Sequence, residues 1–403
     1  MTEAPSWRTG RLGDVLADAR PGFACGQKAP DGVIQFRMNN VTREGTLDWS
    51  RVRRVPRTVK KLQELLVLPG DLLFNSTSSP DLVGKCAVFD GFSEPVTFSN
   101  HFLRIRVDET RADPRYLRRW INLQWSRGVF EGMCRQWVNQ ATVTKDQILA
   151  LPLPLPPVWE QRRIADILDR AEALRAKRRA ALATLGHLPQ ALLRELVNDE
   201  PWPRRPLGEL VEEFRYGTSV KSATDGRPTL RIPNVVSGEV DVTDLKLVPV
   251  TVEEFRRLRL QLGDILFVRT NGNPEFVGRC AAFDPAVIVP SGHNADGFVF
   301  ASYLIRARPK TAILEPVYLR EIMLSPGARR ELRARCATSA GQFNINIAGL
   351  ASVPVPLAPR ALQEEFSRRV EVVQRLKRAQ QAALAKLDVL FASLQRRAFS
   401  GEL

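Results

Sequence analysis

The sequence predicts two tandem α/β (α+β) domains, each followed by one long helix. One set of motifs occurs twice, in the same order, along the 403 residues, as expected for an internal repeat. Each copy mixes short strand-like runs with helical runs, and each ends in a proline-rich stretch followed by a heptad pattern. The predicted limits are 1–157 for the first domain, 158–201 for the first helix, 202–358 for the second domain and 359–403 for the second helix.

Several segments match between the two copies. Their spacing is 193 to 195 residues at first and settles at 202 from about residue 103 onward, which predicts a loop insertion near 285–299. The copies differ most over 22–66 and 216–258, so they share a scaffold and present different surfaces. The matched pairs are RLGDV (11–15) and PLGEL (206–210), LPGDLLF (68–74) and QLGDILF (261–267), VGKCAVFD (83–90) and VGRCAAFD (277–284), DPRYLRRWI (113–121) and EPVYLREIM (315–323), and LPLPLPP (151–157) and VPVPLAP (353–359).

Within each copy, runs rich in β-branched and aromatic residues predict short strands. Examples are VIQFRM and LRIRV in the first copy and DILFV and FVFASYLIRA in the second. The longer runs RYLRRWINLQWSRGVFEGM (115–133) and VYLREIMLSPGARRELRARC (317–336) predict helices. The proline-rich stretch 151–157 is expected to continue neither a sheet nor a helix, so it marks the end of the first domain.

A heptad pattern follows each proline-rich stretch and predicts a helix of thirty-odd residues, roughly 50 Å long at 1.5 Å per residue. Both copies place a polar residue, Arg178 or Gln380, at the same core position, where such residues often fix register. The predicted pairing positions are Ile164, Ala171, Arg178, Leu185 and Leu192 with Ile167, Leu174, Ala181 and Leu188 between them, and Phe366, Val373, Gln380, Leu387 and Leu394 with Leu376, Ala383 and Leu390 between them.

Two arrangements of the helices fit this pattern. Each helix could pack on its own domain, but the narrow seam and the shared phase favour pairing of the two helices with each other. An antiparallel coiled coil would hold the two domains at opposite ends of a rod with pseudo-two-fold symmetry. Such a spacer suits contact with two sites on one DNA duplex at a fixed separation.

Composition narrows the function. The net charge of +15 favours anionic partners, although a general solubility charge explains it equally well. Five cysteines without a C-x-x-C pair, and only three histidines, make disulfide frameworks and zinc sites improbable. The apolar runs are too short for a membrane span and the N-terminus has no apolar signal core, so we expect a cytoplasmic protein.

No catalytic motif emerges. Adenine methyltransferases need an Asn/Asp-Pro-Pro-aromatic loop for the flipped base, and the nearest match, NPEF at 273–276, aligns with the plain loop SPDL at 79–82. GFACGQK at 22–28 has the wrong spacing for a phosphate-binding loop. We therefore expect no catalytic residue and no metal site in this chain.

Polar loops at matching places in both copies are the predicted DNA contacts, because Arg, Asn, Gln, Ser and Thr read base edges and phosphates. The aligned loops are RMNN (37–40) with RIPN (231–234), NSTSS (75–79) with RTNGN (269–273), and RQWVNQAT (135–142) with ATSAGQFN (337–344). The candidate residues are Arg37, Asn39, Asn40, Asn75, Ser76, Thr77, Ser78, Arg135, Gln136, Asn139, Gln140, Thr142, Arg231, Asn234, Arg269, Thr270, Asn271, Asn273, Gln342 and Asn344.

This organisation resembles the specificity (S) subunit of type I restriction–modification enzymes over nearly the whole chain. The resemblance lies in the two copies, the GDLLF and GDILF segments, the boundary PLPPVWEQRRIADILDRAEAL (154–174) with PLAPRALQEEFSRRVEVVQRL (356–376), and the terminal LQRRAFSGEL (394–403). One departure is that Glu160-Gln161 of the first helix becomes Gln363-Glu364 in the second.

The resemblance implies that each domain is a non-catalytic target recognition domain reading one half of a split DNA sequence. It also implies that the helices set the gap and dock two methyltransferase (M) subunits, with restriction/motor (R) subunits as further partners. The complex would methylate adenine or cleave unmodified DNA. This chain would bind no cofactor and no membrane, and S-adenosylmethionine, ATP and Mg²⁺ are expected in the partner subunits.

Two other classes of function stay open. A DNA methyltransferase or nuclease that acts alone would need the motifs that are missing. A helical scaffold that binds only proteins would not explain the paired polar loops or the charge of +15.

Overall fold

The computed structural model describes residues 7–137, 140–198, 202–288, 292, 294–339 and 341–403. The chain forms two compact units: unit 1 is Met1–Arg179 with Ala383–Leu403, and unit 2 is Ala180–Ala382. Each unit contains one globular domain and one end of each long helix, α4 (Val158–Asn198) and α11 (Arg360–Ser400). The unit limits thus fall inside both helices, unlike the limits drawn from sequence.

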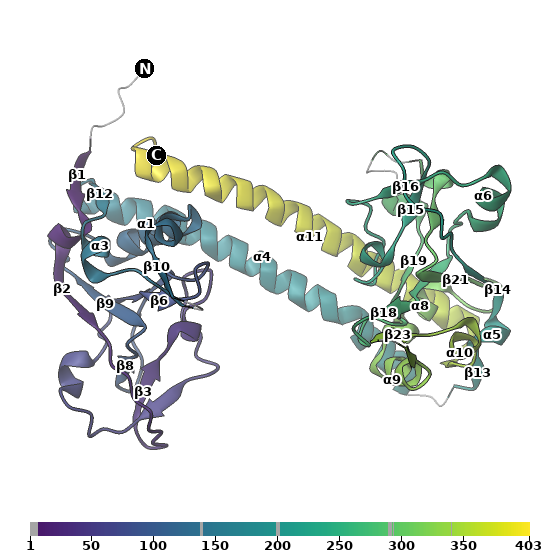
Figure 1. Ribbon diagram of the computed structural model, residues 1–403, viewed down its shortest axis with the longest axis horizontal. Coiled ribbons are helices and arrows are strands. Elements are labelled where there is room, and N and C mark those ends of the chain that lie inside the picture. The colour runs from purple at the N-terminus through teal and green to yellow at the C-terminus, as the bar shows by residue number, and fades with distance from the viewer. Residues whose placement is uncertain (1–6, 138–139, 199–201, 289–291, 293, 340) are drawn as a thin grey trace. The chain divides into compact units, whose positions relative to one another are not determined.

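Four small sheets build the domain of unit 1 (Figure 1). Its strands are β1 (Arg8–Arg11), β2 (Leu16–Pro21), β3 (Val33–Phe36), β4 (Arg53–Val55), β5 (Leu72–Asn75), β6 (Thr77–Ser78), β7 (Cys86–Val88), β8 (Val96–Phe98), β9 (Phe102–Val107), β10 (Arg135–Trp137), β11 (Gln140–Thr142) and β12 (Pro152–Leu155). The central sheet is antiparallel with the order β2-β9-β5-β7, beside a three-stranded sheet β4-β3-β8 in which β3 and β8 are parallel. The remaining sheets are β10-β11-β6 and β1-β12.

The helices of this domain are short. They are η1 (Leu12–Val15), η2 (Met38–Asn40), η3 (Leu62–Leu65), α1 (Pro114–Ser126), α2 (Val129–Met133) and α3 (Lys145–Leu149). The single run predicted over 115–133 is therefore two helices. The break lies at Gly128, whose φ of +73° is a left-handed conformation that favours glycine.

Unit 2 repeats the same four sheets. Its strands are β13 (Arg204–Pro206), β14 (Val211–Tyr216), β15 (Arg227–Leu230), β16 (Lys246–Val248), β17 (Ile265–Val268), β18 (Thr270–Asn271), β19 (Cys280–Ala282), β20 (Val299–Phe300), β21 (Leu304–Pro309), β22 (Ala337–Ser339), β23 (Gln342–Asn344) and β24 (Pro354–Pro356). The central sheet has the order β14-β21-β17-β19, and the others are β16-β15-β20, β18-β23-β22 and β13-β24. The two domains therefore share one topology.

The helices of the second domain differ in detail. They are α5 (Leu207–Leu210), η4 (Ile232–Asn234), α6 (Val252–Leu258), α7 (Pro285–Ile288), η6 (Ala295–Gly297), α8 (Pro316–Leu324), α9 (Pro326–Ala334) and α10 (Ile347–Ala351). The run predicted over 317–336 is again two helices, because Ser325 has extended backbone and caps α9. The insertion expected near 285–299 lies in the connection between β19 and β20, which contains α7 and η6.

Alternate side chains of the central strand face two different cores in each unit. In β5, Leu72 packs in the core that contains α1, and Leu73 faces the core formed with β3 and β8. In β17, Ile265 packs with α8 and Leu266 with β15 and β20. Because both faces of the central strand are covered, it is a continuous apolar run rather than an alternating one.

A buried arginine ties the edge of each central sheet to its neighbouring strand. Arg104 on β9 pairs with Asp18 on β2, and Arg306 on β21 pairs with Glu213 on β14. Both arginines are 1% exposed, and a buried charge of this kind is tolerated only when it is paired. The same ion pair therefore supports the scaffold in both copies.

The proline-rich stretches form edge strands, which corrects the prediction that they would not continue a sheet. β12 pairs antiparallel with β1, and β24 pairs with β13, and each pair forms a two-stranded sheet among the described residues. Proline is tolerated in such edge strands because its missing N–H can face away from the partner.

One row of predicted positions is buried or half-buried in both long helices, and we call such a row an inward row. The residues that are buried or half-buried, as expected, are Ile164, Ala171, Arg178, Leu185 and Leu192 in α4, and Phe366, Val373, Gln380, Leu387 and Leu394 in α11. The two helices thus follow the same heptad phase.

The second predicted row is wrong by one position. Leu174 is 54% exposed and Leu376 is 48% exposed, and Leu188 and Leu390 at the same heptad position are exposed as well. The half-buried members of the predicted row are Ile167, Ala181 and Ala383. The second inward row is Gln161, Leu168, Arg175, Leu182, Pro189 and Leu196 in α4, and Gln363, Val370, Lys377, Leu384, Phe391 and Ala398 in α11.

Several positions of this row hold polar side chains that have specific hydrogen-bond partners. The row therefore cannot be recognised from apolar residues in the sequence. Gln161 accepts from the backbone N–H of Asp113 at 2.9 Å and donates to the carbonyl of Pro156 at 2.9 Å. Gln363 makes the matching bonds to Glu315 at 2.9 Å and to Ala358 at 2.8 Å. These two glutamines therefore occupy equivalent positions. The apparent exchange of Glu160-Gln161 for Gln363-Glu364 arises from aligning the two helices one residue out of register.

Within each unit, one end of α4 packs beside the opposite end of α11. In unit 1, Arg175 Nε donates to Asp388 Oδ1 at 2.6 Å, and its guanidinium lies 4.3 Å from the centre of the Phe391 ring. In unit 2, Leu192 of α4 and Phe366 of α11 line a common cavity of about 250 Å³.

Candidate nucleic-acid interface

Two predicted contact segments of the first copy, far apart in sequence, form one small sheet. β6 pairs with β11, which pairs in turn with β10. Thr77 lies opposite Thr142, and their hydroxyl oxygens are 3.2 Å apart. We call this sheet, β10-β11-β6, the first polar sheet (Figure 1).

The second copy brings the matching segments together in the same way. β18 pairs with β23, which pairs with β22. Thr270 lies opposite Asn344, and the Thr270 hydroxyl donates to Gln342 Oε1 at 3.4 Å. We call β18-β23-β22 the second polar sheet (Figure 1). In each domain the polar sheet follows directly from the buried central strand, so a rigid element positions it.

Most predicted contact residues reach the surface. Arg135 and Gln136 lie on β10, and Asn139 lies outside the described residues. The exposed residues are Asn39, Gln140, Asn273 and Gln342, and the half-buried ones are Arg37, Ser76, Thr77, Thr142, Arg231, Arg269, Thr270, Asn271 and Asn344.

Asn40 and Asn234 are buried structural residues, which corrects their assignment as DNA contacts. Asn40 accepts from the backbone N–H of Arg37 at 2.9 Å and donates to the carbonyl of Asp48 at 2.8 Å. Asn234 makes the same two kinds of bond at 2.9 and 2.8 Å. Each amide therefore closes a 3₁₀ turn and fixes the loop that follows, and its burial keeps it away from DNA.

Asn75 and Ser78 are also buried, at 0% and 5% exposure, and are not available for DNA. For Asn75, the predicted contact fails because the two copies align one residue differently from the sequence-based alignment. Asn75 is the last residue of β5 and corresponds to Val268, the last residue of β17, so Ser76 and not Asn75 matches Arg269. A polar residue at the end of a buried strand cannot be told from a loop residue by composition.

A basic pocket of about 380 Å³ lies beside Arg37 and was missed in the sequence. It is lined by Lys28, Ala29, Pro30, Arg37, Val52, Arg53 and Arg54. Arg54 forms an ion pair with Glu94 at 2.7 Å, while Arg53 donates to the carbonyl of Gln27 at 3.0 Å. Clustered cations attract phosphate. The run RVRRVPR (51–57) in the divergent segment 22–66 is the feature from which it could have been predicted.

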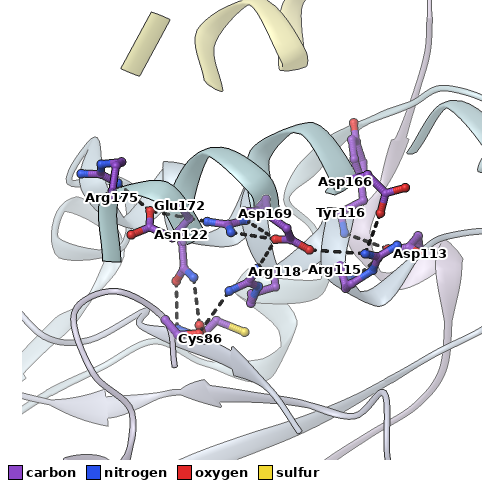
Figure 2. A network of polar contacts seen from close by, with 12 residues as sticks. Cys86, Asp113, Arg115, Tyr116, Arg118, Asn122, Asp166, Asp169, Glu172 and Arg175 are labelled. Carbon is purple, nitrogen blue, oxygen red and sulfur yellow. Dashed lines mark hydrogen bonds and ion pairs between the residues drawn. The ribbon is translucent and has the colours of Figure 1, made fainter. Parts of the chain in front are cut away.

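A cluster of arginines around one carboxylate fixes the first domain to α4 (Figure 2). Asp169 on α4 accepts from Arg118 and Arg119 on α1, each at 2.7 Å, and Arg115 donates to Asp166 at 2.8 Å. Burial and the neighbouring charge of Arg118 lower the pKa of Arg119, and Asp169 works against this shift. The domain that holds the first polar sheet is therefore anchored to the helix by paired charges.

The second domain is joined to the helices by other contacts. Gln190 of α4 donates to Glu321 Oε2 at 2.8 Å, and Lys377 of α11 pairs with Glu239 at 2.6 Å. The two copies thus share the glutamine contacts of Gln161 and Gln363 and differ in the charged contacts that anchor each domain.

The described residues offer no cluster of three or more His, Cys, Asp or Glu side chains that could hold a metal ion. Burial raises the pKa of the Cys86 thiol and raises that of Cys280 to about 12, so both thiols are protonated at neutral pH and act as core residues. None of the helices in the described part of the chain is both long and apolar enough to cross a membrane.

Comparison with known proteins identifies relatives of one kind. Residues 6–183 match the family described as the type I restriction modification DNA specificity domain. The specificity subunit of the type I restriction enzyme EcoKI from Escherichia coli K12 is 31% identical over 274 residues, which cover 62% of this chain and 57% of that subunit. The StySPI specificity subunit of Salmonella potsdam is 24% identical over 393 residues, covering 91% and 82%.

A putative MjaX specificity subunit from Methanocaldococcus jannaschii is 23% identical over 215 residues, covering 52% of this chain and 50% of that protein. The matches to EcoKI and MjaX thus span about half of the length of those relatives. Over residues 6–183 these matches agree with the predicted resemblance, and the relatives are named as specificity subunits.

Two solved structures share the fold. The S subunit of a type I restriction–modification system from M. genitalium has a TM-score of 0.60 and 14% identity, with 99% of this chain and 97% of that chain covered. A chain from a structure of a type I R-M system complex has a TM-score of 0.54 and 20% identity, with 99% of both chains covered. These similarities confirm a mixed α/β fold.

Proposed function

Because residues 6–183 belong to the type I restriction modification DNA specificity family and the relatives are specificity subunits, we propose that this chain selects the DNA sequence for a type I restriction–modification complex. Each globular domain reads one half of a bipartite target, and its polar sheet supplies base contacts. The chain itself catalyses no reaction in this role.

One observation carries the proposal: the same small sheet occurs in both domains with different side chains. The first polar sheet presents hydroxyls, including Thr77 and Thr142, whereas the second combines Thr270 with the amides of Gln342 and Asn344. Hydroxyls and amides on a rigid strand pair are suited to base edges, and a different set on each copy suits two different half-sites. The basic pocket beside Arg37 is suited to a phosphate.

In this proposal the helices pair as an antiparallel coiled coil with approximate two-fold symmetry and set the gap between the half-sites. Two observations favour it. In each unit an end of α4 packs beside the opposite end of α11, and the inward rows of the two helices have the same phase. Heptad rows of this kind are typical of helices that pair along their length.

The outward apolar residues of the helices fit the docking of two methyltransferase subunits. Leu174, Leu188, Leu376 and Leu390 are exposed, and rows of exposed leucine on a charged helix indicate a protein contact. S-adenosylmethionine would then be bound by these partners, and ATP with Mg²⁺ by the motor–nuclease subunits. The complex would act in the cytoplasm, where the DNA is.

Sequencing of methylated adenine in the genome of the host tests the proposal. The wild-type chain should direct methylation to a split, asymmetric motif. The double substitution Thr77→Ala and Thr142→Ala should relax one half of that motif and leave the other half and the gap unchanged. Ser93→Ala, an exposed hydroxyl outside both polar sheets, is the control and should leave the motif intact. A wild-type host without a split motif, or equal loss of both halves in the double variant, would contradict the proposal.

A further inference from the structure

The second polar sheet begins beside an arginine whose place in the first copy is taken by serine. Arg269 and Ser76 both follow the central strand of their domain. The backbone N–H of Arg269 donates to the carbonyl of Tyr303 at 2.9 Å, and that of Ser76 donates to the carbonyl of His101 at 2.9 Å. The backbone is thus the same in both copies, and only the side chain differs.

The guanidinium of Arg269 is stacked on an aromatic ring. It lies 4.6 Å from the centre of the Tyr216 ring, at the end of β14. The Tyr216 hydroxyl accepts from the backbone N–H of Ile347 at 3.2 Å, which ties the ring to the start of α10. Pro21 occupies the place of Tyr216 at the end of β2, so the stack is a feature of the second domain.

The charge of Arg269 is not neutralised by a carboxylate among the described residues. Its side chain has one long hydrogen bond, from Nη1 to the carbonyl of Ser302 at 3.4 Å. No bond of its Nε or Nη2 is formed within the part of the chain that the structure describes. By contrast, Arg306 and Arg308 in the central sheet of the same domain are paired with Glu213 and Asp264.

These features are those of an arginine prepared for a ligand. Stacking on a ring restricts the side chain before binding, so less rotational freedom is lost when hydrogen bonds form. The free Nε–Nη2 edge offers two parallel donors. Tyr303, next to it, is 57% exposed and leaves the site open to a large partner. The DNA group that offers two acceptors at this spacing in the major groove is guanine, through O6 and N7.

We propose that Arg269 reads a guanine in the half-site of the second domain and that Tyr216 is the positioning residue that orients it. This inference rests on the proposed function, since it names a base contact beside the second polar sheet. Because the first copy has Ser76 at this place, the first half-site has no corresponding arginine contact.

The experiment replaces the residues in the host gene and maps methylated adenine across the host's own genomic DNA. With the wild-type chain, one G·C position of one half-site should be preferred about tenfold or more, as expected for a bidentate contact. Arg269→Ala should abolish this preference and leave the other half-site unchanged. Arg269→Lys keeps the charge but not the paired donors, so it should relax the same position.

The positioning role of Tyr216 has its own pair of variants. Tyr216→Phe keeps the ring and should keep the guanine preference, whereas Tyr216→Leu removes the stack and should weaken the preference at the position that Arg269→Ala affects. Ser76→Ala is the matched control in the first copy and should not alter the second half-site.

The outcomes separate this inference from the function on which it rests. A wild-type host without a split motif would overturn the proposed function itself. If a split motif is present and Arg269→Ala leaves it unchanged, only the inference is overturned. It is also overturned if Arg269→Lys restores the full wild-type motif, because charge alone would then suffice, or if both variants lose all methylation while the chain stays soluble.

Discussion

At the scale of single residues, adjacent polar side chains have opposite roles. Asn39 is exposed, and Asn40 is completely buried with its amide bonded to three backbone groups. Both fit the composition of a DNA-reading loop equally well. Only the path of the chain decides which of them faces solvent, and for this reason residue types could predict the loops but not the individual contacts.

Replacing Asn40 tests this difference. Asn40→Ala should lower the free energy of unfolding by about 2–4 kcal/mol, because several buried backbone groups lose their partner at once. Urea unfolding of the whole chain measures it. Asn39→Ala is the control and should change the stability by less than about 0.5 kcal/mol. Equal effects of the two variants would contradict the structural role of Asn40.

A second prediction at the scale of single residues concerns how the free energy of unfolding depends on pH. A hydrogen bond from Arg215, opposed by burial and helped by Arg306, holds the pKa of Glu213 below its ordinary value of 4.5. A carboxyl whose pKa is lowered by folding stabilises the protein above its unfolded pKa, and this contribution is lost as the pH falls through the folded pKa. Glu213→Gln should therefore destabilise the chain by about 2 kcal/mol at pH 7 and by much less near pH 3.

Unfolding by urea at a series of pH values measures the effect. The difference between wild type and Glu213→Gln should be constant from pH 7 to about pH 5 and shrink below pH 4.5. Glu212→Gln, the exposed neighbour, serves as control. A difference that grows on acidification would show that the sign is wrong.

At the scale of elements, the sequence predicts the repeat, the mixed strands and helices and one heptad row of each long helix. The sequence does not predict the second inward row, because an apolar pattern places Leu174 rather than Arg175 in that row. Arg175 faces inward since Asp388 and the Phe391 ring satisfy its charge, and such partners are distant in sequence. The same limit applies to the polar sheets, because β6 and β11 are about 65 residues apart in sequence and β18 and β23 about 72.

The corrected phase of α4 can be tested with two leucines. Leu168→Ala should cost about 2–4 kcal/mol in unfolding free energy, because Leu168 is completely buried in the core of unit 1. Leu174→Ala should cost less than about 0.5 kcal/mol, because that side chain is 54% exposed. Thermal or urea unfolding of the whole chain provides the measurement. A larger loss for Leu174→Ala would restore the originally predicted row.

At the scale of the whole molecule, the proposed function assigns reading to the domains and spacing to the helices. The two tasks are separable along the chain, because the limits between the compact units fall inside both helices. A change confined to the helices should therefore alter the gap in the DNA target without altering either half-site.

Insertion of one heptad into each helix tests this separation. Seven residues added between Arg179 and Ala180, and seven between Ala382 and Ala383, preserve the inward rows and lengthen each helix by about 10 Å. At 3.4 Å per base pair this corresponds to about three base pairs. The methylated motif of the host should keep both halves and gain a gap longer by about three base pairs. Insertion into α4 alone shifts its inward rows past those of α11 and should abolish methylation. If the double insertion leaves both halves and the gap unchanged, the helices do not set the spacing, and the separation must come from the partner subunits.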